Sequence, residues 1–202
     1  MAALILAVLS LAAVVSVRQP ALVTSNSSAA VPADANYVPF RRIYLAPGHE
    51  FIVNTAKGRT ERVTSLLATP GRMTYGQYVW NDVGVPEGRV WVRVDLDRQL
   101  LSVFRSGQEI GTAVILYGAR DTPTPRGWLS VLAKARYHYS KAYDAPMPYM
   151  LRLTADGVAL HASVVREGFA THGCIGLPYA FASHLFDTME VGDELLVVGK
   201  SS

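Results

Sequence analysis

The stretch VWVRVDLDRQLLSVFRSGQEI, residues 90–110, decides the fold of this 202-residue chain. It begins with apolar residues at every second position, Val90, Val92, Val94 and Leu96, separated by Trp91, Arg93, Asp95 and Asp97. This period of two predicts a half-buried strand. The turn at residues 97–99 leads to a second predicted strand at residues 100–104, and Ser106-Gly107 turns the chain toward a third at residues 112–118. The stretch therefore predicts antiparallel hairpins.

The C-terminal part adds further strands and one helix. Residues 121–127 contain two prolines, which exclude regular structure there. Strands are expected around residues 128–133, 157–163 and 191–199. The segment PYAFASHLFDTM, residues 178–189, repeats its apolar residues every three or four positions, which predicts a helix whose His184 faces solvent. The whole predicts a mainly β domain of roughly 110 residues with one packed helix.

The N-terminal part carries a different pattern. Residues 2–17 are sixteen consecutive apolar or small residues, a length between that of a signal peptide and that of a membrane span. We expect residues 1–17 to be a signal peptide or membrane anchor, although a buried core helix is the alternative. Residues 18–88 are interpreted as a linker and a membrane-proximal leader, and residues 89–199 as the main domain. The protein is therefore expected to be exported to the periplasm or cell envelope, either released or anchored to the inner membrane.

The charge of the chain argues against a nucleic-acid partner. Lys and Arg number 19 against 16 Asp and Glu, and no basic tract is interleaved with aromatic residues. Half of the residues are hydrophobic and 17% are charged, which is typical of a globular protein. A formal charge of +3 suits an anionic polymer such as a cell wall, although steering at that charge is weak.

Cys174 is the chain's only cysteine. In an oxidising compartment a thiol that cannot pair within the chain is exposed to oxidation, so a functional role is expected. A reactive thiol needs a base or cation nearby, and His161 and His172 lie thirteen and two positions before it. Gly173 leaves room for an approaching carbonyl, and its N–H with that of Cys174 could stabilise a tetrahedral oxyanion.

Two other interpretations of Cys174 remain. The residue could be a small buried hydrophobe. With His161 and His172 it could also bind zinc, but the sequence has no second cysteine and no HExxH or CxxC pattern to complete a four-ligand site. The remaining histidines, His49, His138 and His184, lack such a context.

The residues around Cys174 resemble a known family. THGCIGLP, residues 171–178, is similar to the active-site signature of the YkuD-type L,D-transpeptidases, in which Ser or Thr precedes His-Gly-Cys. The hairpin from residue 92, TPTPRG, MPYMLRL, GVALHAS and VGDELLVV resemble further parts of that family in the same order. The resemblance covers roughly residues 89–199 and implies that family's β-sandwich or mixed sheet, with one helix packed after the cysteine.

The resemblance also implies roles for single residues. It makes Cys174 the nucleophile and His161 the general base. The catalytic and oxyanion groups it implies are Cys174, His161, His172 and Gly173. The substrate-binding or supporting positions it implies are Tyr149, Thr171, Ala162 and Gly176: Ala162 offers a backbone carbonyl that orients the imidazole, and Tyr149 is a cleft-wall aromatic or, alternatively, a core strand residue.

The chain departs from the family pattern at two places. Nine residues separate His161 from Thr171, fewer than usual, so a tighter loop is expected beside the cleft. Gly176 stands where the family commonly has arginine, and loss of a guanidinium removes a bidentate anchor for substrate or loop. Because the nucleophile and base are kept, activity is expected.

The implied function is peptidoglycan L,D-transpeptidation on tetrapeptide stems through a thioester on Cys174. The product would be a 3→3 cross-link, a lipoprotein tether or an exchanged D-amino acid, and no metal or organic cofactor is implied. Two alternatives remain: an L,D-carboxypeptidase or tether hydrolase of the same family, and a wall-binding module whose catalysis has lapsed. Expected partners are stem peptides, with a lipoprotein as an alternative acceptor, and the membrane through the N-terminal segment.

Overall fold

The computed structural model describes residues 41–69 and 71–199. The chain separates into two units, Met1–Pro32 and Ala33–Ser202, and all described residues belong to the second. The predicted signal peptide or anchor lies outside the described residues. Among those that are described, no helix has the length and apolarity to cross a membrane.

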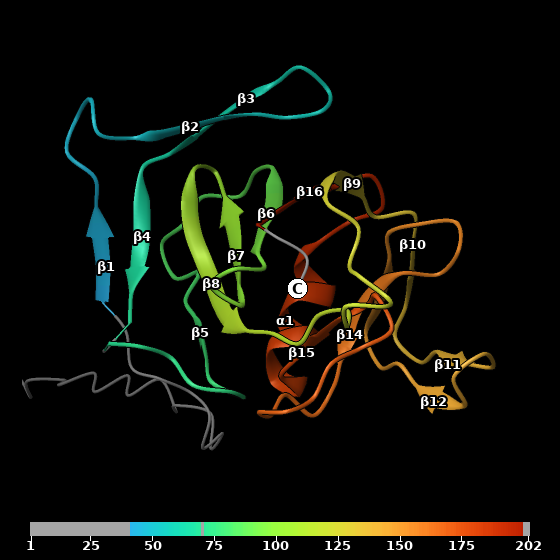
Figure 1. The fold of residues 1–202 in the computed structure, drawn as a ribbon. Helices are drawn as coiled ribbons and strands as arrows, with labels where there is room; N and C mark the ends of the chain where they lie inside the picture. Colours follow the sequence, from blue (N-terminus) through green and yellow to red (C-terminus); the bar gives the residue numbers. More distant parts are fainter. Residues whose placement is uncertain (1–40, 70, 200–202) are drawn as a thin grey trace, which may run out of the picture. The chain divides into compact units, whose positions relative to one another are not determined.

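A large mixed sheet forms one half of the described unit (Figure 1). Its order is β1-β4-β8-β7-β6-β16-β9, and β5 pairs with β8 beside this path. The strands are β1 Arg41–Tyr44, β4 Ser65–Ala68, β5 Tyr78–Trp80, β6 Val90–Asp95, β7 Leu100–Arg105, β8 Gln108–Val114, β9 Gly127–Ser130 and β16 Glu194–Val198. The predicted hairpins are confirmed, because β7 pairs antiparallel with both β6 and β8.

A smaller sheet carries the segments around Cys174. Its order is β10-β13-β14-β15, formed by β10 Ala133–Ala135, β13 Met150–Arg152, β14 Ala159–Ala162 and β15 Ile175–Leu177. Two separate hairpins pair β2 Phe51–Asn54 with β3 Thr60–Val63, and β11 Tyr139–Ser140 with β12 Ala145–Pro146. The predicted helix is α1, Tyr179–Thr188, which follows Pro178 as its N-cap.

The main core lies between the two sheets and the helix. Apolar residues from β6, β7 and β8 pack with Leu160, Ile175 and Leu177 of the small sheet and with Phe181 and Leu185 of α1. His184 is exposed, as expected, and its ring stacks on Trp80 with centroids 5.1 Å apart. The prediction of a mainly β fold with one packed helix after Cys174 is confirmed.

The prediction that β6 is half-buried is wrong, because both of its faces are covered. Trp91, on the face opposite the main core, is only 1% exposed and stacks on Phe104 with ring centroids 4.5 Å apart. Buried Val63 completes this second cluster, and partly buried Val53 and Leu66 pack against it. Residues from the interpreted leader therefore cover the outer face of β6 and β7.

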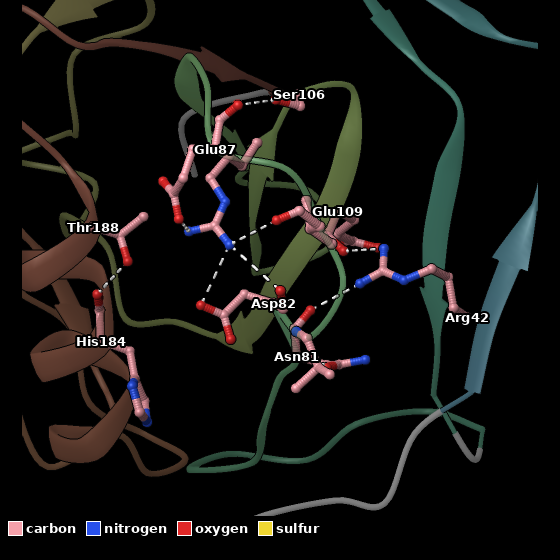
Figure 2. A network of polar contacts seen from close by, with 11 residues as sticks. Arg42, Asn81, Asp82, Glu87, Ser106, Glu109, His184 and Thr188 are labelled. Atoms are coloured by element: carbon pink, nitrogen blue, oxygen red, sulfur yellow. Dashed lines mark hydrogen bonds and ion pairs between the residues drawn. The ribbon is translucent and has the colours of Figure 1, made fainter.

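Polar contacts also hold β1 and β4 in the large sheet. Arg42 donates hydrogen bonds to the carbonyl oxygens of Glu109 at 2.7 Å and Asn81 at 2.8 Å, and Figure 2 shows its guanidinium directed between them. The Glu109 carboxylate accepts the Leu67 N–H at 2.7 Å, and burial raises the pKa of this carboxyl. These bonds satisfy groups that would otherwise be buried without partners.

Candidate active site

His161 and Cys174 lie on one face of the small sheet. In the parallel pair β14 and β15, His161 is opposite Gly176, and Cys174 directly precedes β15, two positions before Gly176. Because side chains alternate along a strand, residues two apart share a face. Strand spacing and rise put the Cα atoms of His161 and Cys174 about 8 Å apart, a separation that an imidazole and a thiol can bridge.

His161 is oriented by the backbone of its neighbour. Its Nδ1 lies 2.9 Å from the Ala162 carbonyl oxygen. A carbonyl can only accept, so Nδ1 carries the proton and the neutral ring leaves Nε2 free to act as a base. Burial lowers the pKa of His161 below its ordinary value of about 6.5, and the hydrogen bond to Ala162 opposes this shift. The ring is therefore neutral above about pH 6.5.

Cys174 is half-buried in an apolar setting. It packs against the cluster of Met147, Met150 and Ala159. Its Sγ lies 4.0 Å from the carbonyl oxygen of Gly157. Burial raises the pKa of the Cys174 thiol, the backbone N–H of Ala159 opposes that shift, and the charge of Asp156 adds to it. The sulfur is therefore protonated at rest near neutral pH.

The turn before Cys174 is held by a buried hydroxyl. Thr124, 2% exposed, donates from Oγ1 to the Gly173 carbonyl oxygen at 2.9 Å and accepts the Gly118 N–H at 2.9 Å. Gly173 has φ +104°, a conformation that favours glycine. A Cβ on Gly118 would lie 2.9 Å from the Cα of Gly173 and 2.2 Å from the Thr122 carbonyl oxygen, so the two loops approach as only glycine permits.

Thr171 and His172 differ in burial. Thr171 is half-buried, and its hydroxyl donates to the Cys174 carbonyl oxygen while its N–H donates to the Tyr117 carbonyl at 3.0 Å. Thr171 thus supports the loop from within. His172 is exposed, and its ring stacks on Tyr143 of the β11–β12 hairpin with centroids 4.8 Å apart.

Tyr149 packs with α1. It precedes β13, has φ +56°, and contacts the rings of Tyr179 and Phe186 at centroid distances of 5.2 and 5.9 Å. It also packs against the main core, whereas Cys174 packs on the other cluster with Met150. These contacts describe the packing of Tyr149; its role as a cleft-wall aromatic stays a prediction.

Gly176 is buried in β15. Its N–H and carbonyl both bond to Leu116, at 3.0 and 2.9 Å. A Cβ at this position would lie 2.9 Å from the Cβ of Ser163 and 3.3 Å from that of Leu116. Close packing of two neighbouring segments thus explains glycine where the resemblance suggested a missing arginine.

Two hollows lie away from Cys174. One, of about 1300 Å³, is lined on the outer face of the large sheet by residues that include Trp91, Phe104 and Glu109. The other, of about 520 Å³, is lined by residues that include Trp80, Arg105 and His184. Neither lining includes a thiol or His161, so size alone does not locate the chemistry.

No metal-binding cluster of three or more His, Cys, Asp or Glu side chains occurs within residues 41–69 and 71–199.

Some groups near the thiol were not predicted from the sequence. Thr124 was predicted only to lie in the irregular segment 121–127. Its position between Pro123 and Pro125 was the available signal that this threonine has a fixed place in a loop. Asp156 and Tyr143 come near the site through tertiary contacts, for which the sequence alone offers no signal.

Comparison with known proteins identifies the family of this chain. The model of the L,D-transpeptidase catalytic domain (YkuD) matches residues 89–198. Over 115 residues the chain is 32% identical to L,D-transpeptidase 1 of Mycobacterium tuberculosis, a match covering 48% of this chain and 46% of that protein. The chain spans about half the length of the curated relatives it matches.

Solved structures give the same result. The L,D-transpeptidase of Stackebrandtia nassauensis superposes with a TM-score of 0.52 at 26% identity, covering 59% of this chain and 61% of that one. An L,D-transpeptidase from Mycobacterium smegmatis also has a TM-score of 0.52, at 19% identity, and covers 79% of this chain and 82% of its own. At that identity the second likeness shows the fold alone.

Proposed function

The chain belongs to the L,D-transpeptidase (YkuD) catalytic-domain family, and from this premise we propose that it is a cysteine-dependent peptidoglycan L,D-transpeptidase. The observation that carries the proposal is the oriented imidazole of His161 on the same sheet face as Cys174. A neutral imidazole with a free Nε2 is suited to remove the thiol proton. Cys174 is the nucleophile and His161 the general base.

The reaction proceeds in two steps on tetrapeptide stems. The Sγ proton passes to His161 Nε2 as the sulfur attacks the carbonyl carbon of the diamino acid at the third position. The C–N bond breaks, and D-alanine leaves with that proton on its amine, so a thioester remains on Cys174. An acceptor amine then attacks the thioester and restores the thiol. No step requires a metal or organic cofactor.

The turn at residues 172–174 is suited to stabilise the tetrahedral intermediate. Gly173 at φ +104° allows successive backbone N–H groups to converge, as in other anion-binding turns. Thr124 holds the Gly173 carbonyl, and Thr171 holds the Cys174 carbonyl. Both bonds fix the backbone before substrate arrives, which is what oxyanion stabilisation requires.

One experiment separates the candidate activities. The full chain is incubated with a disaccharide tetrapeptide, and the products are identified by mass spectrometry, with Cys174→Ala as the control. A cross-linked dimer with released D-alanine is the expected result. A tripeptide monomer would identify a carboxypeptidase, and unchanged substrate would favour a wall-binding module.

We place the protein outside the cytoplasm, in the periplasm or cell envelope, because residues 2–17 are apolar and the proposed substrate is there. Cell fractionation with an antibody to the folded domain tests this location. Recovery in the cytoplasmic fraction would contradict it. Whether the acceptor is a second stem or a lipoprotein is decided by supplying each amine in turn.

A further inference from the structure

A tight turn between β13 and β14 reaches the sulfur of Cys174. The Gly157 N–H donates to the Thr154 carbonyl oxygen at 3.3 Å, and the Val158 N–H donates to the Thr154 hydroxyl at 3.0 Å. Gly157 has φ +106°, and its carbonyl oxygen lies 4.0 Å from Cys174 Sγ. The turn therefore holds its tip next to the nucleophile.

Asp156 is an exposed residue of this turn. Its carboxylate accepts a hydrogen bond from the Thr154 hydroxyl, which fixes the side chain to the turn. After burial, its negative charge is the other influence that raises the pKa of Cys174. A carboxylate here opposes thiolate formation, so activation of the sulfur does not explain its presence.

Three imidazoles also belong to this part of the molecule. His161 lies on β14, and His172 lies in the loop of Cys174 itself. His138, which precedes β11, faces His161 closely enough for its charge to lower the pKa of that ring. Among the described groups that act on Cys174 or His161 through charge, Asp156 is the anionic one. The β13–β14 turn thus carries a negative charge near Cys174.

We infer that Asp156 is a specificity-determining residue that binds the side-chain ammonium group of the diamino acid whose carbonyl Cys174 attacks. The inference rests on the proposed function, because that reaction brings a residue with a second amine to the sulfur. An ammonium paired with Asp156 screens the carboxylate from the thiol. A cationic donor therefore gains affinity and lessens the repulsion that opposes thiolate formation, whereas a neutral donor gains neither.

The test measures binding separately from turnover. The full chain carrying Cys174→Ala is titrated with three stem tetrapeptides that differ only at the third side-chain amine: free, dimethylated or acetylated. Dimethylation keeps the positive charge and adds bulk comparable to acetylation. We expect both charged peptides to bind about 1.5-fold to fivefold more tightly than the acetylated one, the range of exposed ion pairs. This preference should shrink as salt increases.

The matched variant is Asp156→Asn, which keeps the shape and removes the charge. It should abolish the preference by weakening the charged peptides alone, while Asp97→Asn in the exposed β6–β7 turn should leave it intact. With Cys174 restored, Asp156→Asn should also make iodoacetamide alkylation of the thiol half-maximal at a lower pH. That shift is a readout that a purely structural role in the turn would not produce.

Failure of this inference is distinguishable from failure of the proposed function. If the acetylated and charged peptides bind equally, if none binds, or if Asp156→Asn weakens all three alike, Asp156 does not select charge and the inference is overturned. The proposed function fails on a different result, namely no D-alanine release by the unmodified chain. A chain that releases D-alanine equally from all three peptides refutes only the role of Asp156.

Discussion

Replacing Thr124 by valine should show how far the Thr124 hydroxyl holds the turn before Cys174. Valine matches the shape of threonine but has no hydroxyl. Thr124 is 2% exposed and bonds to both the Gly118 N–H and the Gly173 carbonyl at 2.9 Å. The substitution therefore leaves two buried backbone groups without their partner.

The magnitude follows from those two groups. Each unsatisfied buried polar group costs about 1–3 kcal/mol, so Thr124→Val should lower the free energy of unfolding by about 2–6 kcal/mol. Thr124→Ser keeps the hydroxyl and loses one methyl group, which costs about 1 kcal/mol. Urea unfolding of both variants of the full chain gives the two values, and D-alanine release from tetrapeptide reports the state of the turn.

The serine variant should retain most of the turnover, and the valine variant should lose most of it even at temperatures where it is folded. This expectation follows because displacement of Gly173 moves the N–H groups proposed to bind the oxyanion, and such groups act only when positioned in advance. Equal stability of the two variants would refute the argument that the Thr124 hydroxyl holds this turn. Equal turnover would refute its link to catalysis.

Four further predictions concern Gly176, the leader, Cys174 and His161. Gly176→Arg, although it restores the residue common in the family, should lower the free energy of unfolding by several kcal/mol in urea titration, because its Cβ meets a neighbouring carbon at 2.9 Å; a stable variant would contradict this. Deleting residues 1–88 should expose Trp91 and give an aggregating fragment by size-exclusion chromatography, whereas a monomeric fragment would show that the leader is dispensable. Alkylation of Cys174 should be half-maximal above pH 8.5, about the ordinary pKa of a thiol, because burial raises the pKa of Cys174 and the thiolate forms only at higher pH. A midpoint near neutral pH would refute this. His161→Ala should slow acylation of Cys174 by substrate roughly 10²–10⁴-fold.

The elements with strong local patterns could be predicted from the sequence. The alternation in residues 90–96 and the apolar repeat in residues 178–189 are local signals, and both formed the expected elements. The covering of Trp91 could not be predicted in the same way. The strands that cover it are four residues long, and β4 pairs with β8 across more than forty residues, so no periodicity within the leader reports that contact.

In the candidate site, too, some features could be predicted from the sequence and others depend on tertiary packing. The spacing of His161 and Cys174 was compatible with two neighbouring segments, and the parallel pairing of β14 and β15 puts them on one face. The surroundings of Tyr149 and Gly176 depend on packing between segments distant in sequence. Gly176 is required by the approach of Ser163, a neighbour across the strand pair, which composition and motif comparison do not report.

The resting electrostatics of the site favour general-base catalysis over a preformed ion pair. A thiolate and an imidazolium coexist at rest only if the thiol has the lower pKa. Ordinary values differ by about 2 units in the opposite sense, equivalent to about 2.7 kcal/mol, and here burial raises the pKa of Cys174 while lowering that of His161. Under the proposed function, these directions favour proton transfer to His161 during attack on a bound carbonyl. The same burial keeps a lone thiol in its less oxidisable protonated form until a substrate arrives, and a donor whose ammonium pairs with Asp156 removes part of the repulsion at that moment. Under the proposed function, substrate charge and thiol reactivity are thus linked through one carboxylate.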